Sequence, residues 1–317
     1  MKWIKKGLIF KPNGEYEWMS SHVSPLAAIE KKSCIRVFFS TRSKIDQDGN
    51  YVSYLTYIDL DKDNPQKILY LHDKPLLELG REGTFDEFGI MVAKPVVVKN
   101  QVYLYYMGWQ RLASSRSPYQ VCVGLAISDD EGDTFYKYSE GPIVGIDIYD
   151  PISIGNVYVI KEAKIWYMYY TTYKRWECNG IKATPEYNIK LAVSDDGIHW
   201  EKENQVMIEE NEKGGIATPC IFEYQEKYRM LFGYRLPFEE DGTSGKYKIG
   251  YAESDDLIHW KRQDEKAGLS ASDSGWDSEM VCYPHVIKVK NKWLVFYCGN
   301  GYGAGGFGYA ELDESED

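Results

Sequence analysis

The chain has 317 residues and 44% hydrophobic content, which is enough for a large core. Its net charge of −11 argues against an extended nucleic-acid-binding surface. No segment approaches about 18 apolar residues and residues 1–10 hold no long apolar stretch, so we expect neither a membrane span nor a secretory signal.

The six cysteines are spread through strand-like segments without close pairs. Scattered cysteines of this kind are typical of reduced, buried thiols and argue against a zinc site. We therefore expect a cytoplasmic protein with no metal centre. The cysteines are Cys34, Cys122, Cys178, Cys220, Cys282 and Cys298.

Taken in chain order, residues 3–9 read like an outer strand, and repeated strand units follow. Short runs rich in Val, Ile, Tyr and Phe alternate with Gly, Asp, Asn and Pro, and no stretch keeps a helical period. The expected first strands lie at 24–27, 94–98, 156–160, 218–222 and 283–287. The aromatic second strands lie at 35–39, 102–106, 165–170, 228–232 and 293–297. This pattern predicts an all-β chain.

Third strands end in an alanine and lead into a phrase that occurs three times, at 128–135, 194–200 and 254–260. Its serines are 66 and 60 residues apart. The phrase could be a metal or carboxylate site, or a hairpin turn whose aspartates accept backbone N–H groups. Three equivalent copies cannot form one active site, so we interpret it as a turn. This removes six residues from the catalytic candidates: Asp129, Asp130, Asp195, Asp196, Asp255 and Asp256.

Five units of about 63 residues account for the whole chain. Four-stranded repeats of this size predict a single domain over residues 1–317, a five-bladed β-propeller with four antiparallel strands per blade. The last unit stops at a third strand, residues 307–312. We therefore expect the N-terminal strand to pair with it and to close the last blade.

In a propeller the loops that enter the first strands line one axial funnel. Three of these loops carry carboxylates that the other units lack: Asp86, Asp150 and Glu279. Carboxylates around one pocket suit glycosyl transfer, in which one acid protonates the leaving oxygen and another acts as base or nucleophile. We take these three as catalytic candidates. Glu87, beside Asp86, is a substrate-binding candidate that could be the real participant in place of Asp86. The alternative is that such loop carboxylates are simply solvated.

The ends of the second strands add cations and aromatic residues. Arginine and lysine side chains there could bind an anionic sugar or phosphate, and tryptophans could stack on sugar faces. The alternative for the arginines is structural ion pairing. The candidates are Arg42, Trp109, Arg111, Lys174 and Arg235.

His22 and His285 flank the first strands of the first and last units, which ring closure would make neighbours. Each alone is typical of a hydrogen-bonded structural histidine. Together they indicate an axial, substrate-binding position with room for a water or an ion. No cofactor is otherwise expected.

With these residues the chain resembles the five-bladed propeller glycosidases, which include glycoside hydrolase families 43, 32, 68 and 130. In the family 43 pattern, Glu279 resembles the general acid, and Asp86 or Asp150 the supporting aspartate. The chain departs from it in the first blade, where residues 20–22 (Ser-Ser-His) stand in place of an aspartate.

Two further motifs are missing. The chain has no Asn-Asp-Pro-Asn-Gly, which argues against a fructan enzyme, and no Arg-x-Glu-Asp-Pro-Arg, which argues against a mannoside phosphorylase of the usual kind. With Ser-His in the first blade and Glu-Met-Val-Cys-Tyr-Pro at 279–284, it most resembles a glycosidase-like group that accompanies bacterial surface-polysaccharide synthesis.

Two functions stay open at this point. The first is an enzyme that cleaves or transfers a glycosyl unit by carboxylate acid–base chemistry. The second is a propeller that binds carbohydrate, or assembles with polysaccharide-synthesis machinery, without catalysis, and the missing first-blade aspartate favours it. Under either, the expected partner is a carbohydrate or a nucleotide-sugar-like molecule, and the oligomeric state is left open.

Overall fold

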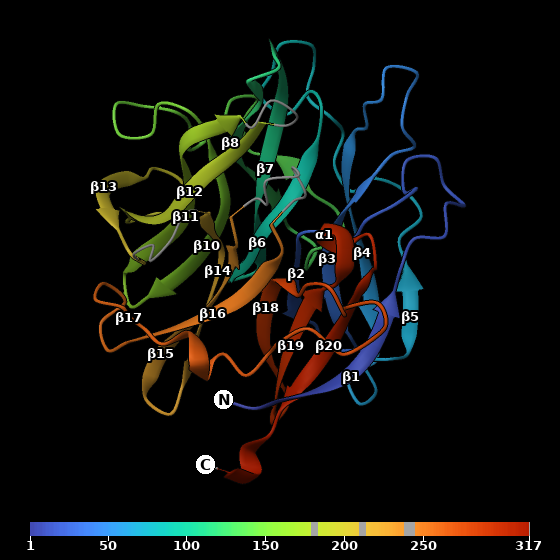
Figure 1. Ribbon diagram of the computed structural model, residues 1–317, viewed down its shortest axis with the longest axis vertical. Helices are drawn as coiled ribbons and strands as arrows, with labels where there is room; N and C mark the ends of the chain where they lie inside the picture. The colour runs from blue at the N-terminus through green and yellow to red at the C-terminus, as the bar shows by residue number, and fades with distance from the viewer. Residues whose placement is uncertain (179–182, 209–213, 238–244, 317) are drawn as a thin grey trace.

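The computed structural model describes residues 1–178, 183–208, 214–237 and 245–316, and these residues form an all-β structure (Figure 1). Helical segments among them are short: α1 (Asn300–Gly303) and the 3-10 turns Asp264–Lys266 and Glu314–Glu316. None of the described helices is long or apolar enough to cross a membrane.

Two four-stranded sheets follow one another in the first half of the chain, each with its strands in sequence order. The first contains β2 (Leu26–Glu30), β3 (Ile35–Arg42), β4 (Ser53–Leu60) and β5 (Ile68–Leu71). The second contains β6 (Ile90–Val98), β7 (Gln101–Ser114), β8 (Ser117–Ser128) and β9 (Tyr136–Lys137).

An eight-stranded sheet follows, built from two antiparallel groups. One group is β10 (Ile154–Glu162), β11 (Ile165–Cys178), β12 (Ala183–Ser194) and β13 (Glu201–Val206). The other is β14 (Gly215–Tyr224), β15 (Lys227–Arg235), β16 (Tyr247–Ser254) and β17 (Lys261–Arg262). The two groups are joined at a single parallel pair, Tyr187 with Gly215.

The last sheet joins the two ends of the chain in the order β1-β20-β19-β18. Its strands are β1 (Trp3–Phe10), β18 (Cys282–Val289), β19 (Lys292–Cys298) and β20 (Phe307–Leu312). β1 runs antiparallel to β20, from the pair Trp3–Leu312 to the pair Phe10–Phe307, and the termini lie near each other in Figure 1. The expected pairing of the N-terminal strand with residues 307–312 is therefore present.

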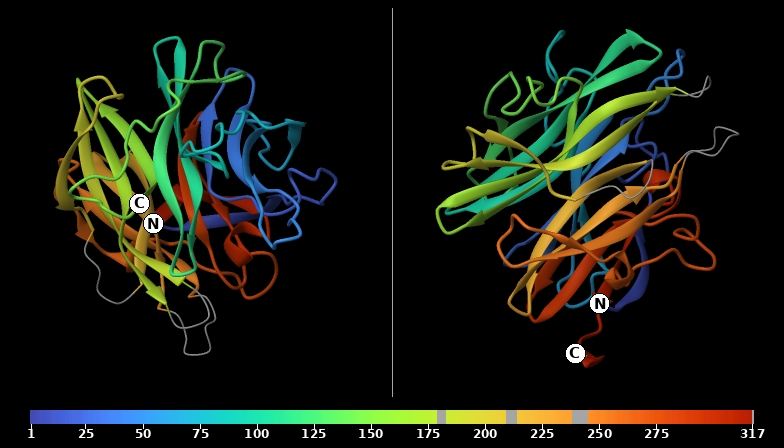
Figure 2. Two further views of the ribbon diagram at one scale, coloured as in Figure 1. Left: turned by 90° about the horizontal axis from the view of Figure 1, so that it is seen from above. Right: turned by 60° about the vertical axis from the view of Figure 1, so that its left-hand side comes forward.

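The first strand of each four-stranded group contacts the first strands of two other groups. The contacts run from β2 to β6, β10, β14, β18 and back to β2, and Figure 2 shows the sheets from above and from the side. Large aromatic side chains such as Tyr169, Phe232, Tyr251 and Tyr297 are fully buried. Apolar burial of this size stabilises the packing of these β-strands.

The repeated acidic phrase forms turns between third and fourth strands, as predicted. In the last copy, Ser254 Oγ accepts the backbone N–H of Leu257 (3.0 Å), and Asp256 Oδ1 accepts those of Ile258 and His259. The other two copies have the corresponding serine and aspartate bonds, at Ser128 with Asp130 and at Ser194 with Asp196. These aspartates cap the backbone of their own turns.

Candidate functional site

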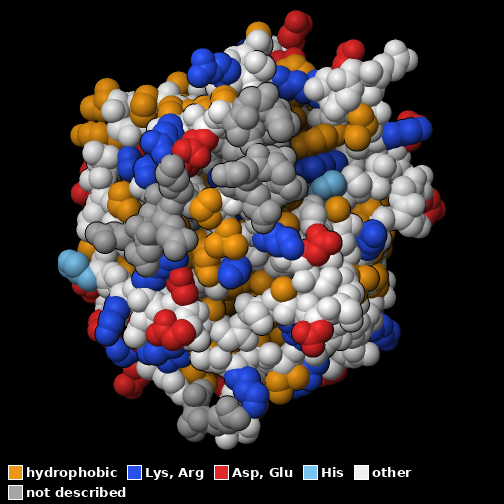
Figure 3. Space-filling model, viewed as in Figure 1, with side chains coloured by type: hydrophobic (Ala, Val, Ile, Leu, Met, Phe, Trp, Pro, Cys, Tyr) orange, Lys and Arg blue, Asp and Glu red, His pale blue; other side chains and the backbone are white. Residues whose placement is uncertain are grey.

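A cavity of about 530 Å³ opens where the ends of second and third strands meet the loops that enter first strands. Its described lining contains two arginines, Arg42 and Arg235, and no aspartate or glutamate. The aromatic members of the lining are Tyr51, Trp109, Tyr119, Tyr173, Tyr187, Tyr247, Tyr283 and Tyr302. On the face seen in Figure 3, acidic and basic side chains are otherwise interspersed.

The aromatic side chains form a continuous wall, with each ring contacting the next. Trp109 packs against Tyr51 (ring centroids 6.0 Å apart) and Tyr119 (6.4 Å). Tyr173 connects Tyr119 (6.4 Å) to Tyr187 (5.6 Å). This half of the wall presents ring faces and edges of the kind that sugars stack on.

The second half of the wall continues from Tyr187, whose hydroxyl is hydrogen-bonded to that of Tyr247. Tyr247 in turn contacts Tyr283 (6.0 Å) and Tyr302 (5.8 Å). Burial raises the pKa of Tyr119 and of Tyr302 to about 12. These phenols are therefore protonated at neutral pH and can both donate and accept hydrogen bonds.

Arg42 lies at the end of β3, with its guanidinium carbon 4.3 Å above the ring of Tyr51. Its Nη1 is 3.0 Å from Nε2 of His22, whose Nδ1 is 2.9 Å from Ser21 Oγ. Burial and the charge of Arg42 lower the pKa of His22 to about 4. The imidazole is therefore neutral at pH 7: Nε2 accepts from Arg42, and Nδ1–H donates to Ser21.

Two other predicted arginines support the same wall. Arg111 donates from Nη2 to the carbonyl of Tyr51 (2.9 Å) and stacks over Phe88 (4.6 Å). Arg235 is buried, donates from Nη2 to the carbonyl of Pro185 (2.7 Å), and its guanidinium carbon is 5.2 Å from the ring centre of Tyr187. The structure thus brings four predicted binding residues to this wall: Arg42, Trp109, Arg111 and Arg235. A fifth, His22, is hydrogen-bonded to Arg42.

The predicted catalytic carboxylates do not border this cavity. Asp86 is buried, accepts from Tyr106 (3.1 Å) and pairs with Lys137 (2.6 Å), and it borders a smaller cavity of about 310 Å³. The side chain of neighbouring Glu87 accepts a hydrogen bond from the backbone N–H of Gly83 (2.9 Å). This bond stabilises the loop that contains both residues.

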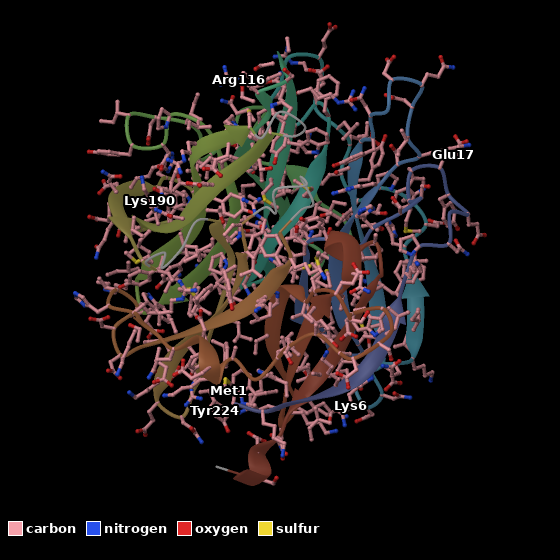
Figure 4. The ribbon with its side chains drawn as sticks, viewed as in Figure 1. Met1, Lys6, Glu17, Arg116, Lys190 and Tyr224 are labelled. Carbon is pink, nitrogen blue, oxygen red and sulfur yellow. The ribbon has the colours of Figure 1, made fainter. Side chains whose placement is uncertain are left out.

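Asp150 is fully buried and accepts hydrogen bonds from Tyr170 (2.9 Å) and Lys190 (2.9 Å), with Lys202 3.2 Å away. Burial by itself would raise the pKa of Asp150, but hydrogen bonds from Thr172, Lys190 and Tyr170 and the charge of Lys202 hold it below the ordinary value. Figure 4 labels Lys190, whose Nζ donates one of these hydrogen bonds. A carboxylate held this way is a stable anion, whereas a general acid needs a raised pKa.

Glu279 differs from the two aspartates because it is exposed. Its backbone N–H donates to Asn300 Oδ1 (2.7 Å). The sulfur of the next residue, Met280, accepts a hydrogen bond from the backbone N–H of Tyr302, which lines the cavity (3.4 Å). Glu279 therefore lies next to a residue that supports one end of the aromatic wall.

The last two predicted residues lie outside the cavity lining. Lys174 is exposed on β11. His285 is buried on β18, where its Nε2 is 3.2 Å from the carbonyl of Ala28, and burial followed by the charge of Lys94 holds its pKa well below the ordinary value. His22 and His285 thus have separate partners. The described residues contain no group of three or more His, Cys, Asp or Glu that could hold a metal ion.

The wall residues that were not among the predicted binding residues include Tyr51, Tyr119, Tyr187 and Tyr247. A signal existed for two of them. Tyr187 and Tyr247 are 60 residues apart, which equals the spacing between the second and third copies of the acidic phrase. Equivalent positions in successive repeats lie at equivalent positions in the fold, so this pair could have been placed together.

Comparison of sequences finds a glycosyl hydrolase family model, an uncharacterized relative and a phosphorylase relative. The model of the family described as "Glycosyl hydrolases family 32 N-terminal domain" matches residues 147–310. Uncharacterized protein MT1551 of Mycobacterium tuberculosis is 32% identical over 316 residues, covering 99% of this chain and 100% of that protein. The 1,2-beta-oligomannan phosphorylase of Thermoanaerobacter sp. (strain X514) is 26% identical over 234 residues, covering 73% of this chain and 71% of that protein.

Solved structures share the fold at low sequence identity. The beta-1,2-mannobiose phosphorylase of Listeria innocua, in complex with beta-1,2-mannobiose, has a TM-score of 0.69 at 15% identity and covers 100% of this chain and 98% of its own. A thermostable family-43 glycoside hydrolase has a TM-score of 0.63 at 14% identity, covering 92% and 88%. These similarities indicate the fold of glycosidase-like propellers.

Proposed function

This chain belongs to the family of the glycosyl hydrolases family 32 N-terminal domain, and from that premise we propose that it binds a carbohydrate in the tyrosine-lined cavity. We further infer that the eight-stranded sheet counts as two blades, which gives one five-bladed propeller domain over residues 1–317. The single parallel pair Tyr187–Gly215 and the cyclic contacts of β2, β6, β10, β14 and β18 support this count.

The observation that carries the proposal is the continuous aromatic wall around a cavity of about 530 Å³. This volume fits the usual size of small-molecule sites, and a short oligosaccharide would fill it. Aromatic rings offer stacking area to the apolar faces of sugars, while protonated phenols offer hydrogen bonds to sugar hydroxyls. Binding needs no carboxylate, and the described lining contains none.

The proposal is tested by calorimetric titration with neutral and acidic oligosaccharides of two to four units. We expect Trp109→Ala and Tyr302→Ala to weaken binding at least tenfold, because each removes a ring from the wall. Tyr138→Ala is the matched control, since Tyr138 is exposed and lies outside the cavity lining. Absence of binding by any sugar, or equal binding by the wild type and folded Trp109→Ala, would overturn the proposal.

A second function, glycosyl cleavage or transfer with Glu279 as general acid, is favoured by one observation. Among the predicted catalytic carboxylates, Glu279 is the exposed one, whereas Asp86 and Asp150 are buried in ionic networks. Glu279→Gln should abolish turnover of a responsive glycoside and leave sugar binding intact. Turnover that survives this change, measured by reducing-sugar or phosphate-dependent assay, contradicts the assignment.

A further inference from the structure

The cavity differs in charge from the chain as a whole. The sequence contains 48 acidic and 37 basic residues, yet the described cavity lining has two arginines and no acid. Four arginines elsewhere in the described structure pair with carboxylates. These are Arg36 with Asp59, Arg81 with Glu140, Arg175 with Glu186 and Arg262 with Asp264.

Arg42 does not follow this pattern. Its contacts within the described chain are the Tyr51 ring, 4.3 Å away, and His22 Nε2, 3.0 Å away, and no described carboxylate forms an ion pair with it. Because the imidazole of His22 is neutral and accepts a hydrogen bond, it orients the guanidinium without cancelling its charge. A half-buried guanidinium keeps its charge at any physiological pH and gains from an anionic partner.

A second cation reinforces the charge at this end of the wall. Arg111 is bound to the carbonyl of Tyr51, stacks on Phe88, and likewise forms no ion pair with a described carboxylate. Two guanidinium groups thus flank Tyr51, one over its ring and one on its carbonyl. Their positive potentials add in a recess that is partly shielded from water.

We propose that Arg42 binds an oxyanion, the carboxylate of an acidic sugar or a phosphate, with the sugar ring against Tyr51 and Trp109. The proposal rests on carbohydrate binding in the cavity and names the class of ligand. A guanidinium presents two parallel N–H groups to the two oxygens of a carboxylate or phosphate. His22 is a positioning residue, because its hydrogen bond to Nη1 leaves the remaining donors of Arg42 for the ligand.

The decisive experiment compares each acidic sugar with its uncharged methyl ester, and adds phosphate as a free oxyanion. Calorimetric titrations would use di- and trisaccharides of glucuronic, galacturonic and mannuronic acid, the methyl ester of each, and sodium phosphate. We expect at least one free acid to bind at least tenfold more tightly than its ester. Arg42→Met should remove this difference, and Arg42→Lys should restore only part of it because the planar fork is lost.

Arg81→Met is the matched control, since Arg81 is an exposed arginine outside the cavity lining. It should leave all affinities unchanged, and thermal unfolding identifies any variant that fails to fold. Phosphate binding that depends on Arg42, without any uronate preference, supports the oxyanion site with phosphate as its source. Equal binding of acids and esters without Arg42-dependent phosphate binding, or affinities unchanged in Arg42→Met, overturns this inference but leaves carbohydrate binding standing. Absence of binding by every probe, neutral esters included, removes both.

Discussion

At the scale of single residues, three buried aspartates follow the same rule. Asp86, Asp150 and Asp277 each accept a hydrogen bond from a tyrosine 20 residues later, at 3.1, 2.9 and 3.0 Å. Each also pairs with a lysine on the fourth strand of its sheet: Lys137, Lys202 and Lys5, respectively. Because the aspartates precede first strands and their partners lie on second and fourth strands, each anchors its incoming loop across its own sheet.

Asp150→Asn tests this anchoring role. The change keeps the shape of the side chain but removes the anion from beside Lys190 and Lys202. We expect a loss of about 3 kcal/mol, because breaking a buried ion pair leaves its partners without a counter-charge. Urea denaturation at pH 7 measures the loss. Asp147→Asn is the control: Asp147 also pairs with Lys202 but is 37% exposed, so its effect should stay below about 1 kcal/mol.

The pH dependence separates charge from shape in the same variant. The pKa of Asp150 lies below the ordinary value of 3.8 in the folded state, so its stabilisation is present above about pH 4 and disappears as pH falls through the folded pKa. The stability gap between wild type and Asp150→Asn should therefore be constant from pH 6 to 8 and narrow below about pH 4. An undiminished gap at pH 3 would mean that packing, not charge, is the source.

At the scale of elements, the repeated turn is held by one serine and one aspartate. Ser254 Oγ accepts the N–H of Leu257, a residue that is 1% exposed and has a φ of 67°. That conformation is disfavoured for a residue with a branched side chain, so the hydrogen bond stabilises a turn that leucine would not adopt alone. The other two copies have glycine in the positive-φ part of the turn, at Gly132 and Gly197.

Ser254→Ala should cost about 1–3 kcal/mol, because it leaves the buried N–H of Leu257 without an acceptor. Thermal unfolding followed by circular dichroism measures the loss. Asp255→Asn changes the next residue, which is 80% exposed and only 3.6 Å from Lys227, and should shift stability by less than about 0.5 kcal/mol. A turn that tolerates both changes equally does not depend on the serine.

Elements also show how far the sequence predicts this molecule. Spacing was enough for the strands, the acidic turns and the pairing of β1 with β20, because repeat units and period-two patterns are local signals. The spacing did not predict which way the side chains point in the loops that precede first strands. Asp86 and Asp150 precede first strands as predicted, but their carboxylates bond to side chains of second and fourth strands. The 20-residue spacing to Tyr106 and Tyr170 was the available signal.

The cavity was predicted only in part, for a related reason. Arg42, Trp109 and Arg235 follow from their place at the ends of second strands. Tyr119, Tyr187 and Tyr247 come from third strands, where alternation predicts burial but does not distinguish a core tyrosine from a cavity tyrosine. That distinction depends on how neighbouring sheets meet, which no single strand encodes.

At the scale of the whole molecule, the two ends of the chain meet in one sheet through the N-terminal strand. β1 takes the place of a fourth strand beside β20, as β9 does beside β8 and β13 beside β12. Lys5 on β1 also repeats the lysine position of those strands: its Nζ lies 2.6 Å from Asp277 and 2.8 Å from Ser272 Oγ. The two ends of the chain are thus joined by a hydrogen-bonded ladder and by ion pairs, of which Lys5–Asp277 is the most buried.

Lys5→Met tests whether that ion pair couples the two ends. Asp277 is 2% exposed, and without Lys5 its remaining described side-chain partner is Tyr297. We expect a loss of about 2–3 kcal/mol and a fall in Tm of roughly 3–5 °C for a chain of this length. Lys6→Met is a control on the same strand, because Lys6 forms a more exposed pair with Glu311 (3.3 Å), and it should change stability by no more than about 0.5 kcal/mol.

The double variant Lys5→Met with Asp277→Asn decides between pairing and packing. If the loss comes from an uncompensated buried carboxylate, neutralising Asp277 should return part of it, so that the two changes together cost less than their sum. Strict additivity would mean that Lys5 contributes independently of Asp277, through its hydrogen bond to Ser272. Coupling would instead show that the ion pair between the first strand and the loop before β18 contributes directly to stability, so that it holds the two ends of the chain together.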